Sequence, residues 1–163
     1  MKFDRHTLTL AFCIAFFAPV WAILGPYIGI TTGAVALICA GLFTEAGNTI
    51  KQAKPVSIGF LLGDVWATTV VELLKVMPFT NDINLFLLLF VFGGSAVLIA
   101  SQMPKHINLS AWLAGFAIGL TIMSPVSKLG TLPLQIAISM LVGVWYVGVF
   151  VNFVMEKLNR GSK

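Results

Sequence analysis

The chain has 163 residues, of which 58% are hydrophobic and 10% are charged, and its net charge is +4. Its mean hydropathy of +0.97 is too high for a soluble domain, in which about 25% of residues are charged. A spanning helix needs roughly 20 apolar residues, so the composition predicts about six transmembrane helices with short loops. This leaves no room for a soluble catalytic or DNA-binding domain. The basic residues are spread over predicted loops, which argues against nucleic-acid binding.

Apolar runs interrupted by Gly, Pro and charged residues predict an all-α integral membrane protein, a single transmembrane domain covering residues 1–163. The first run resembles a signal peptide. It is longer than the usual apolar core and lacks a good cleavage pattern, so we expect a retained helix. The predicted helices cover residues 8–24, 28–44, 56–74, 83–101, 109–123 and 134–154.

The distribution of basic residues predicts the orientation in the membrane. The two tails and the second and fourth loops fall on one side, and they carry eight basic residues: Lys2, Arg5, Lys51, Lys54, Lys105, Lys157, Arg160 and Lys163. The other side carries two, Lys75 and Lys128. Because basic residues favour the cytoplasmic side, we expect both termini in the cytoplasm.

A weak internal repeat aligns Leu62–Trp66 with Leu141–Trp145 at an offset of 79 residues. Three helices in each half would make a 3+3 inverted repeat, a plan that recurs in transporters. Chance similarity between apolar segments is the alternative. Trp66 and Trp145 occupy matching places in this alignment. Two interpretations stay open: the pair shapes a solute path, or each Trp simply packs or faces lipid.

The stretch from Trp21 to Ala67 carries a family resemblance. Its marker residues are Trp21, Ala22, Ile23, Leu24, Gly25, Pro26, Gly33, Phe43, Ala46, Gly47, Gly63, Trp66 and Ala67. This order resembles a bacterial inner-membrane family catalogued as domain of unknown function 1097. The resemblance implies a multi-span protein of the bacterial inner membrane and no particular activity. Asp64 departs from the pattern, which has an uncharged residue there, so the resemblance assigns no role to Asp64.

Asp64 is the most informative residue because it lies near the centre of the predicted helix 56–74. A carboxyl at that depth costs ~3 kcal/mol on insertion scales and usually faces a bundle interior or a wet cavity. Proton coupling or attraction of a cation is one interpretation, and a carboxyl that holds helices together is the other. Thr68, Glu72 and Lys75 follow on the same helix face. They predict either a polar solute path or an outer Glu72–Lys75 pair that leaves Asp64 and Thr68 as the only deep pair.

Other polar residues carry weaker predictions. Glu45 lies at the end of the helix 28–44, where the helix dipole disfavours an anion. We expect it to pair with Lys51 or Lys54, in a loop salt bridge or a gate. GxxxG motifs at residues 59–63 and 115–119 indicate close helix packing and offer contact surfaces for a homo-oligomer.

Neither cysteine and neither histidine belongs to a metal-binding pattern, and we find no nucleophile–base pair or phosphate loop. We therefore expect no metal, no cofactor and no enzymatic activity. The leading hypothesis is a channel or transporter for a small cation or a neutral polar molecule such as an amide, with proton coupling through Asp64. The main alternative is a structural or regulatory membrane subunit without transport activity, and an intramembrane enzyme ranks third.

Overall fold

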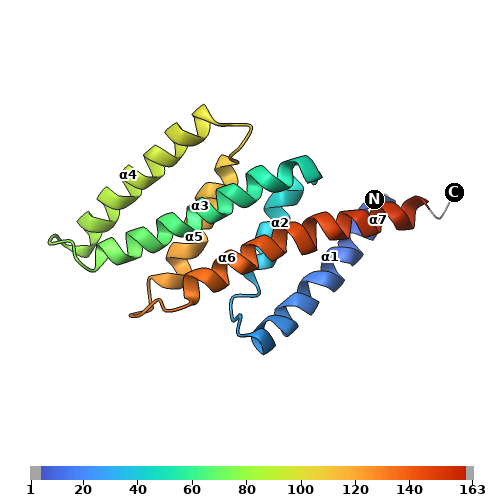
Figure 1. Cartoon of the computed structure of the whole chain (residues 1–163), viewed down its shortest axis with the longest axis horizontal. Coiled ribbons are helices and arrows are strands. Elements are labelled where there is room, and N and C mark those ends of the chain that lie inside the picture. Colours follow the sequence, from blue (N-terminus) through green and yellow to red (C-terminus); the bar gives the residue numbers. More distant parts are fainter. Residues whose placement is uncertain (1–4, 161–163) are drawn as a thin grey trace. The chain divides into compact units, whose positions relative to one another are not determined.

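The structure is a computed structural model that describes residues 5–160, and these residues form helices without any strand (Figure 1). The elements are α1 (Arg5–Leu24), the 3-10 helix η1 (Gly25–Ile28), α2 (Val35–Glu45), α3 (Ile50–Leu74), α4 (Asn81–Gln102), α5 (Leu109–Met123), α6 (Leu132–Val142), the π-helix η2 (Gly143–Phe150) and α7 (Val151–Arg160). The last three form one continuous helix, which we call the last helix. The all-α class predicted from the sequence is therefore confirmed. Lys2 and Lys163, used above for the orientation, lie outside the described residues.

Four helical segments within the described residues are long and apolar enough to cross a membrane. They are Ala11–Ile28, Ile50–Leu74, Asn81–Gln102 and Leu132–Lys157. The other two apolar helices, α2 and α5, have 11 and 15 residues. At 1.5 Å per residue they reach about 16 and 22 Å, less than the roughly 30 Å of a hydrocarbon core.

The helix expected over residues 28–44 begins only at Val35. Gly29 ends the preceding 3-10 helix in the left-handed region, at φ 81°. Residues 29–34 then run outside regular helix, through two β-branched threonines and Gly33, which favour helix poorly. This irregular segment is partly covered by protein, since Ile30, Thr32 and Gly33 are buried.

The connection from α2 to α3 is shorter than expected. Gly47 (φ 103°) and Asn48 (φ 49°) adopt left-handed conformations, and the Asn48 N–H donates to the carbonyl of Phe43 at 3.1 Å, as in a Schellman cap. The helix predicted over residues 56–74 then starts at Ile50. Lys51 therefore belongs to the exposed first turn of α3 and not to a loop.

The described residues divide into two compact units. Unit 1 holds α1, α2, the start of α3 as far as Ala53, and the last helix from Ile138 onward. Its core contains Ala18, Ala40 and Val147, against which Tyr146 packs.

Unit 2 is Lys54–Ala137, which holds most of α3 together with α4 and α5. Its core contains Ala96 and Ala100 of α4 and Trp112 of α5, and Trp66 of α3 packs against them. Each unit thus has its own three-helix packing.

Candidate functional site

Asp64 lies near the middle of α3, the 25-residue helix Ile50–Leu74, and only 5% of the residue is exposed. Its Oδ1 atom is buried and has no hydrogen-bond partner. Within the described residues no Lys, Arg or His forms an ion pair with it. A buried acceptor without a partner forfeits about 1–3 kcal/mol, and more when it is charged. The carboxyl therefore has unused capacity to accept a proton or to bind a cation.

The close approach of α3 and α5 determines what surrounds this carboxyl. A methyl group added to Gly119 of α5 would lie 2.5 Å from the Cβ of Ala67 and 3.6 Å from Oδ1 of Asp64. Gly63 likewise has no room for a side chain, because a Cβ there would lie 2.5 Å from the backbone nitrogen of Phe116. Glycines on both helices thus bring the α5 backbone close to the carboxyl, while Oδ1 accepts no hydrogen bond from the described residues.

Thr68 follows Asp64 on the same helix face but does not satisfy its carboxyl. Its hydroxyl donates to the main-chain carbonyl of Asp64 at 2.9 Å and approaches the Met123 sulfur at 3.7 Å. Thr68 is therefore tied back to its own helix, a common arrangement for Thr in helices.

Glu72 forms an ion pair with Lys75 at 2.7 Å, and both side chains are exposed to a substantial degree. Glu72 lies eight residues beyond Asp64, about 12 Å along the helix. The four residues predicted as one stripe therefore divide into a deep part, Asp64 and Thr68, and an outer ion pair.

Trp66 and Trp145 have different surroundings. Trp66 packs edge-to-face against Phe92 at 5.0 Å and Trp112 at 4.7 Å between ring centroids, so its ring belongs to the core of unit 2. Trp145 belongs to unit 1 and is 40% exposed. A shared position beside a solute stays a prediction for these two residues.

Glu45 and Lys51 are both exposed, and no ion pair joins them in the part of the chain that the structure describes. Their interpretation as a salt bridge or gate remains a prediction.

Unit 1 contains a buried polar pair that sequence reasoning did not identify. The hydroxyls of Thr32 and Ser139 lie 3.0 Å apart in a hydrogen bond, and both residues are buried. They are separated by 107 residues, so no local pattern links them. The only local signal was the helix-disfavouring run Thr31-Thr32-Gly33.

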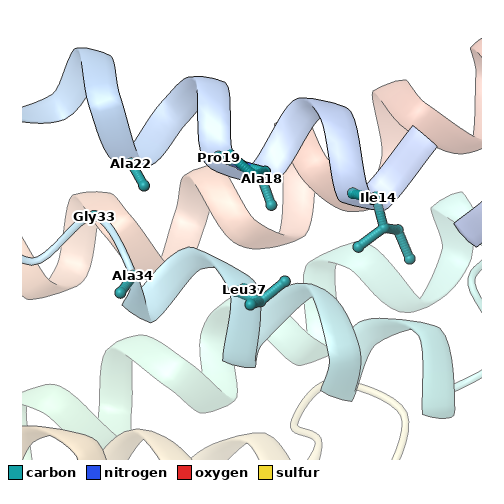
Figure 2. Close-up of a pocket in the computed structure, with 8 residues that line it drawn as sticks. Ile14, Ala18, Pro19, Ala22, Gly33, Ala34 and Leu37 are labelled. Carbon is teal, nitrogen blue, oxygen red and sulfur yellow. The ribbon is translucent and has the colours of Figure 1, made fainter. Parts of the chain in front are cut away.

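A groove of about 300 Å³ lies between α1 and α2. Figure 2 shows Ile14, Ala18 and Pro19 of α1 facing Leu37 of α2 and Ala34, the residue before α2, across it. All eight lining residues are apolar or glycine, so the groove offers no polar side chain to a hydrophilic solute.

Among the described residues, no three His, Cys, Asp or Glu side chains gather as a metal site requires.

No curated protein and no solved structure matches the chain. The model of one family, described as protein of unknown function (DUF1097), matches residues 11–155. This match covers most of the chain and agrees with the resemblance seen in its first half. The protein is therefore a member of the DUF1097 family.

Proposed function

We propose that this protein is a channel or transporter for a small solute, with Asp64 as the group that binds a proton or a cation. The observation that supports this most directly is the buried Oδ1 of Asp64, which has no partner within the described residues. If the carboxyl served only to hold helices together, its oxygen atoms would be expected to accept hydrogen bonds from them. The solute classes that suit the site are a small cation, or a neutral polar molecule such as an amide moved together with a proton.

The proposed architecture has six spans, an inverted 3+3 repeat and both termini in the cytoplasm of a bacterial cell. The short α2 would cross together with residues 29–34. Irregular backbone is tolerated at membrane depth only where protein or a cavity covers it, and the burial of Ile30, Thr32 and Gly33 is consistent with this. The protein would act as a channel or transporter and not as an enzyme, without nucleic-acid partners, in the inner membrane and as a homo-oligomer.

The transport proposal is tested in proteoliposomes that contain a trapped pH-sensitive dye. Ammonium, methylammonium and acetamide serve as probes, with and without a pH gradient. Wild-type protein should carry at least one probe above the rate of empty vesicles, and Asp64→Asn should abolish this flux or its pH dependence. Asn keeps the size of Asp but cannot ionise.

Asp82→Asn is the matched control, since it makes the same chemical change at an exposed residue in the first turn of α4. Glu72→Gln is a second control at the outer ion pair, and both should keep the flux. Wild-type vesicles impermeable to every probe would favour the structural-subunit alternative. An Asp64→Asn protein with normal, pH-dependent flux would refute the proposed role of Asp64.

The orientation is tested separately by labelling single cysteines in intact cells, starting from a Cys13→Ala/Cys39→Ala chain. Gln52→Cys and Ser127→Cys are suitable because both residues are exposed. An impermeant maleimide should label Ser127→Cys from outside and Gln52→Cys only after the cells are opened. Labelling of both from one side would overturn the six-span arrangement without touching the role of Asp64.

A further inference from the structure

Each compact unit combines helices that come from both halves of the chain. Unit 1 combines α1, α2 and the last helix, which are the first, second and sixth apolar segments. Unit 2 combines α4, α5 and α3, the fourth, fifth and third segments. Each unit therefore contains the first two segments of one half of the chain and the third segment of the other half.

The contact between the second and third segments is the same in both units. In unit 2, the residues along α3 are Gly59, Gly63 and Ala67, and they meet Ala111, Gly115 and Gly119 of α5. In unit 1, the residues along the last helix are Ser139, Gly143 and Val147. They meet Thr32, which precedes α2, and Ala36 and Ala40 of α2. Each of these four sets of residues is spaced by four and consists mostly of small residues. Because the residue numbers of the two partners increase in the same direction from contact to contact, the two helices run parallel in both units.

Neither contact leaves room for a side chain at its glycine. A Cβ added to Gly59 in unit 2 would lie 3.0 Å from the Cβ of Ala111. A Cβ added to Gly143 would lie 2.7 Å from the Cβ of Cys39. Small residues thus allow the same close approach in each unit.

The contact between the first and third segments also repeats. Trp66 of α3 packs edge-to-face on Phe92 of α4, with ring centroids 5.0 Å apart and an angle of 85°. Tyr146 of the last helix packs edge-to-face on Phe17 of α1, at 5.9 Å and 87°. Leu24 and Val142 line the same pocket. Because Leu24 follows Phe17 in the chain whereas Val142 precedes Tyr146, α1 and the last helix run antiparallel, as α3 and α4 do across their short loop.

We infer that the two halves of the chain repeat one three-helix plan and exchange their third helix. The surface formed by α1 and α2 binds the last helix, and the surface formed by α4 and α5 binds α3. This inference does not depend on any transport activity.

The packing also refines the repeat seen in the sequence. It makes Gly63 equivalent to Gly143 and Trp66 equivalent to Tyr146, which is an offset of 80 residues between the two third helices. Trp145 is therefore not the counterpart of Trp66. At this offset Asp64 corresponds to Val144, which is fully buried, so the carboxyl has no equivalent in the other unit.

The exchange is tested by cross-linking in the full chain. The Cys13→Ala/Cys39→Ala chain receives a protease site after Val76, an exposed residue between α3 and α4. One cysteine pair, Thr32→Cys/Ser139→Cys, probes unit 1. A second pair, Thr68→Cys/Met123→Cys, probes the equivalent contact in unit 2, where the native side chains approach to 3.7 Å.

After oxidation and proteolysis, both pairs should keep the chain at full-length mass on a non-reducing gel, and reduction should release two half-length fragments. Thr69→Cys/Met123→Cys is the control, because Thr69 is the exposed neighbour of Thr68, and it should give half-length fragments with or without reductant. Half-length fragments from either test pair would overturn the exchange. A disulfide between Thr32→Cys and Gly59→Cys would also overturn it, since that pair would join if each half kept its own third helix.

Discussion

Replacing Gly63 by Ala tests the packing on which both the carboxyl site and the repeat depend. The new methyl group would lie 2.5 Å from the backbone nitrogen of Phe116, whereas ordinary contacts begin near 3.4 Å. The obstacle is backbone of α5, which cannot rotate away, so the two helices must separate. Overpacking of this kind costs about 1–3 kcal/mol. Ala favours helix over Gly by up to about 1 kcal/mol, which offsets part of the cost.

Subtracting a gain of about 1 kcal/mol from this cost leaves a net loss of about 0–2 kcal/mol. At roughly 2–4 °C per kcal/mol for a chain of this size, Tm in detergent should fall by up to about 8 °C, and it should lie about 2–12 °C below the Tm of a Gly→Ala variant that gains the same helix propensity without a clash. Gly41→Ala is the matched control, because Gly41 lies within α2 with nothing within 4 Å of its added Cβ. Its Tm should stay equal or rise. A Gly63→Ala protein as stable as Gly41→Ala would refute the close packing of α3 on α5.

Three further outcomes are expected from the same unfolding assay. Asn84→Ala should lower stability by about 1–3 kcal/mol, because the Asn84 amide donates to two carbonyls of the α3–α4 loop. Thr32→Val should cost about 1 kcal/mol by leaving the Ser139 hydroxyl without its partner, and adding Ser139→Ala should recover most of that loss. A Thr32→Val/Ser139→Ala variant that is less stable than Thr32→Val alone would contradict the pairing. Asp64→Asn should not lower Tm, because it removes a buried charge and no observed Oδ1 hydrogen bond; a clear fall would show that the carboxyl supports the fold.

Apolar runs predicted the helices well where they end at strong local signals. The helix over residues 109–123 has the predicted bounds, because Asn108 caps its start by accepting from the Ala111 N–H at 2.9 Å. The start of α2 was misplaced because hydrophobicity alone does not register the helix-breaking effect of Gly29 and the Thr-rich segment after it. The central place of Asp64 in α3 followed directly from its apolar flanks.

Contacts between distant residues were beyond the reach of sequence reasoning. Helical spacing places Thr68 near Asp64, but it does not reveal that the hydroxyl bonds the main-chain carbonyl instead of the carboxyl. The proposed repeat was visible in the sequence only as a few matching residues. Its register, and the proposed exchange of third helices, depend on which small residues meet within each unit, and those residues are far apart in sequence.

The asymmetry of the repeat bears on the role of Asp64. In the proposed repeat Asp64 corresponds to Val144, which is buried, so the same packing plan would accept an apolar side chain at this place. A carboxyl there carries an insertion cost of ~3 kcal/mol, and its Oδ1 recovers none of that cost through a hydrogen bond. The plan therefore does not need a charge for stability. If the exchanged units are the moving parts of a carrier, one ionisable group per chain is sufficient to bind one proton or cation in each cycle, and a second carboxyl at Val144 would only add to the cost of burying charge.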